Sequence, residues 1–356
     1  MTVPHRSRSI TAPLRDGLAP SSVLDRRSLL AGAGLLGLTT LSACGAGEAG
    51  TLTSGSDDDS DLRTVTDAMG REVELPLQPR AVVSLHYAGT QAMMDLGVIP
   101  VGTGAAGQSG EDGLEYVPEN LWTDLQEVPV VVPGGEVDIE AVAGLEPDLV
   151  LAHNVLEDDV LSQLEQIAPV FGFTLRGGDR ADWQQRVHEV AEALGLGQEF
   201  TDLKSAWEDE LATTAEEYAD VTDGLVVGVI GAYETGNFYA WGEENMPGTL
   251  LTPLGLTWSA QENQAVAGQG EPEATISSER ILEVVGDADL LFYDSNLLGE
   301  PNSFMVELQE SSLYQQLEAV KAGRVHAFGK NTIAGFSDAR FSLEQIRGAL
   351  EDFRSS

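Results

Sequence analysis

Six side chains suited to holding an organic ligand lie at or beyond predicted strand ends. The strands are predicted at 81–85, 170–175 and 225–230, and the last two of these side chains are expected on the loop that adjoins the third strand. Aromatic rings pack on organic groups, and a guanidinium group binds paired oxygens. Ligands of open α/β proteins bind beyond the carboxyl ends of strands, so all six are predicted to be ligand-binding. They are His86, Tyr87, Arg176, Tyr233, Tyr239 and Trp241.

Direct metal binding is a rival chemistry with little support. His153, with Asn154, follows a further strand predicted at 148–152, but His188 falls within a predicted helix and His326 within a predicted strand. Zinc sites need several His, Cys or carboxylate ligands at close spacing, and no His-rich acidic loop occurs. We therefore expect no metal site built from the protein alone.

Enzyme chemistry is also not indicated. The chain has no nucleophile elbow, no phosphate-binding glycine loop and no closely spaced acid–base set. The stretch Gly-Thr-Gly-Ala-Ala-Gly at 102–107 follows the dinucleotide pattern, but no predicted helix opens there. A Gly/Ala-rich cleft loop explains it better, so neither catalysis nor a cofactor is predicted.

Strands and helices alternate in two stretches of the chain. After a short hairpin at 64–67 and 71–75, the first stretch has strands at 81–85, 99–102, 148–152 and 170–175 and helices at 90–96, 138–143 and 158–167. The second has strands at 225–230, 289–293 and 324–328 and helices at 248–254, 278–285, 312–317 and 342–353. Alternation with short joints predicts parallel sheets covered on both faces.

The alternation stops between the two stretches. Helices are predicted at 182–194 and 197–218 with no strand between them. The second helix carries one apolar stripe, formed by Phe200, Leu203, Trp207, Leu211 and Tyr218. About 22 helical residues span ~33 Å, enough to join two domains. We predict an α/β protein with an N-terminal lobe at 62–178, a helical segment at 179–220, a C-terminal lobe at 221–356 and a cleft between the lobes.

The N-terminal 43 residues have the pattern of an export signal. Arg26 and Arg27 precede an uncharged run at 28–43 that ends in small residues. This run is shorter than the ~20 residues that cross a bilayer, so a cleaved leader is predicted rather than a spanning helix. The arginine pair resembles the twin-arginine export signal.

Cys44, the only cysteine, follows the leader directly. Leu-Ser-Ala-Cys at 41–44 resembles the bacterial lipobox, in which the cysteine is acylated and becomes the mature N-terminus. The alternative is a leader cleaved near a chance cysteine, which would leave a free thiol. The Gly, Ser and Asp residues at 44–61 have almost nothing to bury and are predicted to form a flexible tether.

The chain is strongly acidic, with a formal charge of −39. The leader holds five of the 19 basic and two of the 58 acidic side chains, so the remaining 313 residues carry −42. No basic stripe exists to bind nucleic acid. Such a charge favours solubility and tolerance of salt. A saline habitat would explain it, although an acidic surface has simpler causes.

Five short blocks resemble the iron-siderophore and vitamin B12 substrate-binding proteins of ABC importers. They are Asp-Ala-Met-Gly-Arg at 67–71, Pro-Arg-Ala-Val-Val-Ser-Leu at 79–85, Asp-Leu-Gly-Val-Ile-Pro-Val-Gly at 95–102, Leu-Glu-Pro-Asp-Leu-Val at 145–150 and Val-Lys-Ala-Gly-Arg-Val-His at 320–326. The resemblance runs from about residue 64 to the end. It implies two Rossmann-like lobes joined by a single long α-helix, with a ligand cleft between them and little hinge closure.

The resemblance also implies partners. The protein would be a monomer, lipid-anchored on the outer face of the cytoplasmic membrane, that captures a ferric siderophore and delivers it to a permease with its ATPase subunits. By block position, Glu140 and Glu279 match the two acidic residues with which this family docks on its permease. The alternative for both is a carboxylate placed by the helix dipole.

The ligand's chemistry stays open at this point. A cobalamin or haem carrier of the same family is one alternative, and a surface lipoprotein without a transport role is another. The negative charge favours neutral or cationic hydroxamates over anionic catecholates. A local Arg176 or Arg340 would reverse that preference, because exposed charges beyond about 8 Å are screened by salt.

Overall fold

Two short antiparallel strands precede the first lobe. In the computed structural model, which describes residues 62–104, 117–118, 121–179 and 181–356, β1 (Leu62–Thr66) pairs with β2 (Glu72–Pro76). Asp67 closes the turn between them by accepting the backbone N–H groups of Met69 and Arg71, each at 2.9 Å. It also forms a 2.6 Å ion pair with the Arg71 side chain. The predicted hairpin is confirmed.

The sheet of the first lobe is entirely parallel. Its order is β4 (Gly102–Thr103), β3 (Val82–Ser84), β5 (Leu149–His153) and β6 (Val170–Phe173). The strands are almost wholly buried, as a parallel sheet with covered faces requires. The parallel arrangement is as predicted, but the strand expected at 99–102 is only the two residues of β4.

The described residues of this part of the chain form the helices α1 (Tyr87–Asp95), α2 (Trp122–Leu125), α3 (Ile139–Gly144), α4 (Asp158–Leu164) and α5 (Gln184–Leu194). Helix α1 begins three residues earlier than predicted because His86 caps it, its imidazole accepting the N–H of Ala88. Asp138 caps α3 in the same way. A capping histidine is an uncommon helix start, and the sequence pattern did not indicate it.

The sheet of the second lobe is mixed. Its order is β10 (Glu273–Ser277), β8 (Asn237–Trp241), β7 (Val226–Gly231), β11 (Leu290–Asp294) and β12 (Val325–Gly329), with β9 (Thr257–Trp258) also paired to β7. Strands β8 and β10 run antiparallel to their neighbours. The placement of Tyr239 and Trp241 on a loop is therefore wrong, because both lie on β8. The sequence pattern did not predict β8 because this five-residue strand pairs with antiparallel neighbours and is not part of the strand–helix alternation that indicated the other strands.

The helices of this lobe are short except for the last. They are α7 (Gly248–Leu251), α8 (Ala260–Val266), α9 (Ile281–Val284), α10 (Ser303–Glu310), α11 (Glu318–Lys321) and α12 (Phe336–Ser355). The helix predicted at 312–317 is a 3₁₀ turn, Tyr314–Gln316, and the one at 278–285 is the 3₁₀ turn Ser278–Arg280 followed by α9. Helix α12 starts six residues before the predicted position, and α8, α10 and α11 were not predicted.

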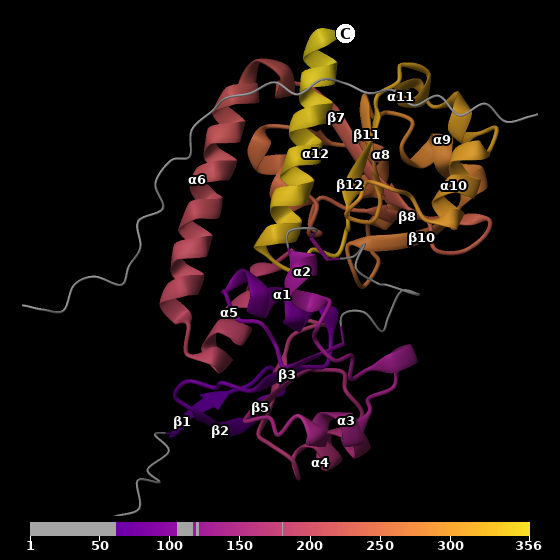
Figure 1. Cartoon of the computed structure of the whole chain (residues 1–356). Helices are drawn as coiled ribbons and strands as arrows, with labels where there is room; N and C mark the ends of the chain where they lie inside the picture. The colour runs from indigo at the N-terminus through magenta and orange to yellow at the C-terminus, as the bar shows by residue number, and fades with distance from the viewer. Residues whose placement is uncertain (1–61, 105–116, 119–120, 180) are drawn as a thin grey trace, which may run out of the picture. The chain divides into compact units, whose positions relative to one another are not determined.

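Helix α6 (Gly197–Thr222) connects the two lobes along the chain and has 26 residues. It lies beside α12, as Figure 1 shows. Arg354 of α12 contacts Asp220 at 2.7 Å, and Arg340 contacts Glu210 at 3.1 Å. The predicted stripe is confirmed: Trp207 and Tyr218 are buried, and the other three members pack against the same core.

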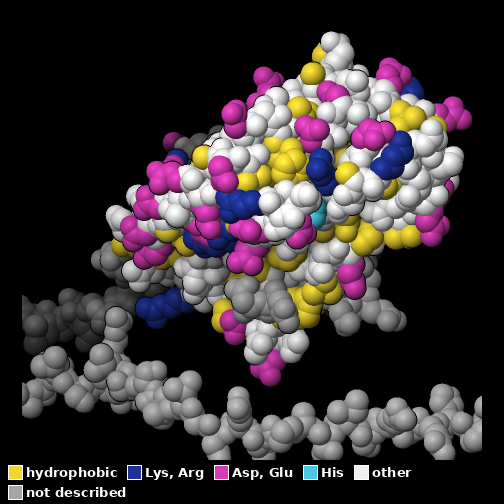
Figure 2. All heavy atoms as spheres, turned by 90° about the horizontal axis from the view of Figure 1, so that it is seen from above, with side chains coloured by type: hydrophobic (Ala, Val, Ile, Leu, Met, Phe, Trp, Pro, Cys, Tyr) yellow, Lys and Arg dark blue, Asp and Glu magenta, His cyan; other side chains and the backbone are white. Residues whose placement is uncertain are grey.

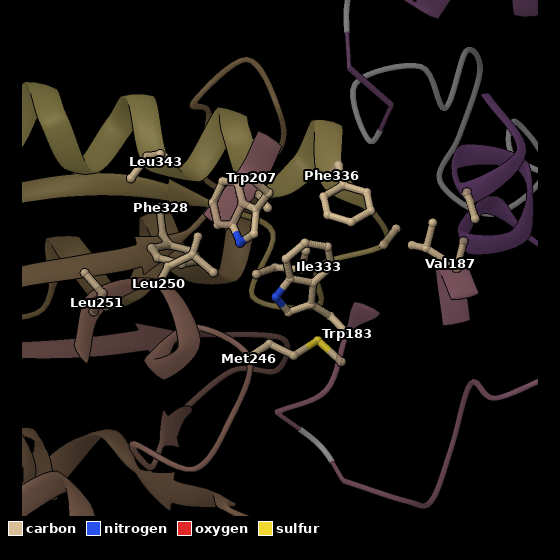
Figure 3. Packing of buried hydrophobic residues seen from close by; sticks show 14 of the residues in the cluster. Trp183, Val187, Trp207, Met246, Leu250, Leu251, Phe328, Ile333, Phe336 and Leu343 are labelled. Carbon is tan, nitrogen blue, oxygen red and sulfur yellow. The ribbon is translucent and has the colours of Figure 1, made fainter. Parts of the chain in front are cut away.

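The largest of the apolar clusters spans both lobes, and each lobe also has a cluster of its own. The largest cluster joins Phe171 and Phe173 of β6 to Phe292 of β11 and Phe328 of β12. At its centre, the ring of Trp183 lies 5.9 Å from that of Trp207 and 5.1 Å from that of Phe336 (Figure 3). The Trp183 indole N–H also donates to the Thr249 hydroxyl at 3.2 Å. Close packing of this kind resists relative movement of the elements that share it.

The surface reflects the composition. Acidic side chains are spread over the face shown in Figure 2, with basic groups among them. Within the described ranges, no helix is long and apolar enough to cross a membrane.

Candidate functional site

The first-lobe side of the candidate site is built around His86. This residue is 6% exposed, and its ring lies 4.4 Å from Tyr87 and 5.3 Å from His153. Its Nδ1 accepts the N–H of Ala88 at 3.2 Å, which requires an unprotonated Nδ1. Burial lowers the pKa of His86 to about 3, assisted by the nearby charges of His153 and Arg186. The imidazole is therefore neutral at physiological pH.

Arg176 lies in the same lobe, in the exposed segment that follows β6. The side chain of Asn154 holds its backbone in place by accepting the N–H groups of Leu175 and Arg176 and donating to the Arg176 carbonyl at 2.7 Å. The guanidinium is exposed, and its charge contributes to the lowered pKa of His86. The Arg176 cation therefore lies within electrostatic range of His86 and Tyr87.

Three aromatic rings form the second-lobe side. The ring of Tyr233 lies 5.0 Å from Tyr239 and 6.4 Å from Trp241, edge-on to both, and Tyr239 and Trp241 are nearly parallel at 6.2 Å. Tyr233 is 43% exposed and Trp241 only 5%. A Cβ atom at Gly231 would approach the Trp241 indole to 2.5 Å, so only glycine there leaves room for the ring. We call Tyr233, Tyr239 and Trp241 the aromatic group.

Asp294, at the end of β11, adjoins the aromatic group. It accepts the backbone N–H of Asn331 at 2.8 Å. Burial raises the pKa of Asp294 to about 6. Although 43% of Tyr233 is exposed, its hydroxyl end is buried beside the Asp294 carboxylate, and both raise the pKa of this phenol well above its usual value; an electrostatic interaction with Tyr87 contributes to the shift. The structure thus brings Tyr87 of the first lobe into electrostatic range of Tyr233 of the second.

A buried polar cluster links the lobes close to this point. Lys330, which follows β12, forms a 2.7 Å ion pair with Asp338, and Gln91 of α1 donates to Asp338 at 2.6 Å. The Lys330 ammonium lies 5.0 Å from the centre of the Tyr87 ring. The sequence reasoning missed all three residues. Lys330 lies two residues beyond the strand predicted at 324–328, so a search for side chains just after predicted strands would have found it.

A hollow of about 480 Å³ contains residues of both lobes. Gly178, Asp179 and Ala181 line it from the loop after β6, and Glu244 and the segment 270–272 line it from the second lobe. None of the six predicted ligand-binding residues borders it. Its lining residues nevertheless follow candidate ligand residues closely along the chain: Gly178 comes soon after Arg176, and Glu244 soon after Trp241.

Both predicted docking residues are exposed carboxylates in first helical turns. Glu140 lies in the first turn of α3, and Glu279 lies in the 3₁₀ turn before α9. The backbone N–H of Glu279 donates to the Ser277 hydroxyl at 3.4 Å. Neither carboxylate has a hydrogen bond or ion pair among the described residues, so both side chains are available to a partner.

Arg340 is the other arginine expected to supply a local charge to the ligand. Its side chain is engaged with Glu210 on α6. The export-signal arginines Arg26 and Arg27, the lipidation candidate Cys44 and residues 105–107 of the 102–107 loop lie outside the described residues. Across the described ranges, no group of three or more His, Cys, Asp or Glu is placed to hold a metal ion.

Known proteins share both sequence and fold with this chain. Residues 82–332 match the family model described as periplasmic binding protein. The probable siderophore-binding lipoprotein YfiY of Bacillus subtilis is 27% identical over 321 residues, covering 88% of this chain and 94% of YfiY. A cobalamin-binding protein of Halobacterium salinarum is 26% identical over 277 residues, covering 76% of this chain and 69% of that protein.

Among solved structures, the siderophore periplasmic binding protein from the fuscachelin gene cluster of Thermobifida fusca superposes with a TM-score of 0.64. It is 25% identical and covers 78% of this chain and 98% of its own. The family match spans both lobes and α6, so the two-lobed α/β architecture is the one these proteins share.

Proposed function

The chain belongs to the periplasmic binding protein family, and on that premise we propose that it captures an iron(III)–siderophore complex outside the cytoplasm and delivers it to an ABC importer. Members of this family are substrate-binding proteins, and we assign this chain no catalytic role and no cofactor. The siderophore is cargo.

The closeness of the two sets of candidate residues supports the proposal: the Lys330 ammonium lies 5.0 Å from the centre of the Tyr87 ring, and the adjacent Asn331 donates its backbone N–H to Asp294, which adjoins the aromatic group. An iron–siderophore complex presents an organic shell and chelating oxygens. Tyr233 offers an exposed ring for the shell, and Arg176 offers an exposed guanidinium for the oxygens. The siderophore-binding relatives support the same ligand class.

A fluorescence titration tests the ligand class, because Trp241 belongs to the aromatic group. Iron complexes of a trihydroxamate, a tris-catecholate and citrate would be titrated separately into the purified protein, with cobalamin and haem alongside. We expect saturable quenching by one iron complex at submicromolar concentration. Absence of a response to all five compounds would overturn the proposal.

Cobalamin is the second candidate, favoured by the similarity to the Halobacterium cobalamin-binding protein. Both ligands bring a metal chelate with a large organic surface, which the aromatic group suits equally. Saturation by cobalamin without a response to any iron complex would select this candidate. Mass spectrometry of a chelate that co-purifies with the protein would identify the ligand directly.

Delivery would use the permease and its ATPase subunits, with Glu140 and Glu279 as the docking carboxylates. Their exposure and their lack of partners in the described chain support this role. Arginines on a permease would form charge-assisted hydrogen bonds with them. The double variant Glu140→Ala, Glu279→Ala should abolish uptake and leave ligand affinity unchanged, whereas Glu136→Ala, another exposed carboxylate, should leave uptake intact.

Anchoring would require acylation of Cys44 after export through the Arg26–Arg27 signal. The protein would then act as a monomer tethered to the outer face of the cytoplasmic membrane. Cys44→Ala should release it into the medium, and mass spectrometry of the wild-type N-terminus should show the acyl chains. An unmodified thiol at Cys44 would refute the anchor without affecting the ligand proposal.

A further inference from the structure

A fully buried carboxyl group lies directly behind the aromatic group. Glu262 of α8 is 0% exposed. One of its oxygens accepts the backbone N–H of Val229 at 3.1 Å, and the other accepts that of Trp241 at 3.1 Å. Buried polar groups that bind backbone donors on two strands at once constrain how those strands lie.

These two donors mark the place where the pairing of two strands ends. Strands β7 and β8 pair at Ile230–Ala240 and at Gly231–Tyr239. In that antiparallel register the next pair would be Val229 and Trp241. The Glu262 carboxyl group occupies that position of the ladder and takes both N–H groups. It therefore replaces the next pair of backbone groups between β7 and β8 and ends their pairing before Trp241, which stays paired on its other side with Glu273 of β10.

The carbonyl group and the side chain of Trp241 also have defined partners. Its carbonyl accepts the indole N–H of Trp258 at 3.0 Å, and its own indole lies against Gly231. Glu262 itself is anchored, because the Ser259 hydroxyl accepts the N–H of Glu262 at 3.0 Å and contacts Asp287 at 2.5 Å. Position and direction of the Trp241 ring thus follow from groups that do not face the ligand.

We infer that Glu262 is a positioning residue for ligand binding: by ending the pairing of β7 with β8 it sets where Tyr239 and Trp241 present their rings. This inference rests on the proposed function for its consequence in affinity, but the placement of Trp241 is a property of the protein alone. The two can therefore be tested separately.

The test compares Glu262→Ala with Asp67→Ala. Asp67 is also a buried carboxylate that accepts backbone N–H groups, but it lies in the first-lobe hairpin. The near-ultraviolet circular dichroism band of Trp241 is first defined as the difference between wild type and Trp241→Phe. Affinity for the iron complex that quenches wild type is then measured at a temperature at which far-ultraviolet dichroism shows every variant folded.

Both alanine variants should unfold at lower temperature than wild type. Only Glu262→Ala should lose the Trp241 band and bind the iron complex about tenfold more weakly, as expected when an aromatic anchor is misplaced. Glu262→Gln keeps one acceptor oxygen and turns the other towards a donor as an N–H group, so its affinity should fall between those of wild type and Glu262→Ala. In a Trp241→Ala background, Glu262→Ala should weaken binding by less than it does in wild type, because only the placement of Tyr239 is left to disturb.

A folded Glu262→Ala protein with an unchanged Trp241 band would overturn the inference, whether or not any ligand is found. Equal losses of affinity in Glu262→Ala and Asp67→Ala would also overturn it, since both would then reflect stability alone. Failure of wild type to bind any chelate would contradict the proposed function, and the Trp241 band would still decide the role of Glu262.

Discussion

The two lobes build their sides of the candidate site in different ways. The first lobe uses an all-parallel sheet, and its ligand candidates follow strand ends and are fixed by a helix cap at His86 and by the Asn154 side chain. The second lobe adds antiparallel β8 and β10 to a parallel core, and two of its three aromatic rings lie on β8 itself. A site can thus be assembled from residues beyond strands on one side and within a strand on the other.

The lobes also differ in the ionisable group that each buries near the site. His86 in the first lobe has a lowered pKa, and Asp294 in the second has a raised one. Burial favours the uncharged form in both, so the base takes up its proton only at lower pH and the acid keeps its proton to higher pH than usual. The two groups should therefore respond to pH in opposite directions.

The largest expected effect is on the free energy of unfolding, and it comes from the apolar core that the two lobes share. Trp183→Ala should lower the free energy of unfolding by about 3–5 kcal/mol, because it removes a large side chain from the shared core. Phe304→Ala, at a residue 38% exposed, should change it by about 0.5 kcal/mol or less. Urea denaturation followed by circular dichroism measures both. A loss below about 1 kcal/mol for Trp183→Ala would show that the lobes do not depend on this contact.

The next effect is a change of stability with pH. The depressed pKa of His86, about 3 against 6.5, stabilises the fold above pH 6.5, and this contribution is lost as pH falls towards 3. The advantage of wild type over His86→Asn, which retains a capping side chain, should therefore shrink by about 1.4 kcal/mol per pH unit in that window.

Asp294→Asn is the corresponding variant of the second lobe, and its effect on stability should change with pH in the opposite direction. The pKa of Asp294 is raised from 3.8 to about 6, so the contribution of this residue is fully present below pH 3.8 and lost as pH rises through 6. The advantage of wild type over Asp294→Asn should shrink in that direction. Denaturation curves from pH 4 to 7 measure both differences, and slopes of the same sign would contradict the contrast between the lobes.

Ligand affinity should depend more on the second lobe than on the first. Tyr233→Ala should weaken binding about tenfold, since the exposed ring loses its contact with the ligand. Tyr87→Ala should have a smaller effect, because that ring is partly covered by Lys330. Tyr233→Phe keeps the ring and serves as the control. Fluorescence titration would reveal the reverse order if the first lobe supplied the main contact surface.

The smallest effect is expected at the exposed cation of the first lobe. Arg176→Ala should weaken binding of an anionic iron complex about threefold at low salt and less at high salt, because exposed charges are screened. A neutral complex should be unaffected. An equal loss for both complexes would mean that Arg176 contributes packing rather than charge.

Much of the parallel architecture was predictable. The apolar composition of buried runs such as Leu149–His153 and Leu290–Asp294 predicts strands. The helical spacing of the apolar stripe on α6 predicts a helix. The six candidate ligand residues also came from one rule, the position after a strand. That rule applied to Lys330 as well, but it could not indicate Gln91 or Asp338, which lie within helices and meet only in three dimensions.

The sequence by itself determined the local elements, the acidic surface and the residue types from which a ligand site could be made. Those properties depend on neighbours along the chain, whose spacing can be read directly. Only the tertiary structure decided that Tyr239 and Trp241 lie on an antiparallel strand, that Trp183 joins the lobes and that Glu262 ends the pairing of β7 with β8. Each of these depends on groups distant in sequence, and burial and hydrogen bonding between such groups leave no periodic signal in the chain.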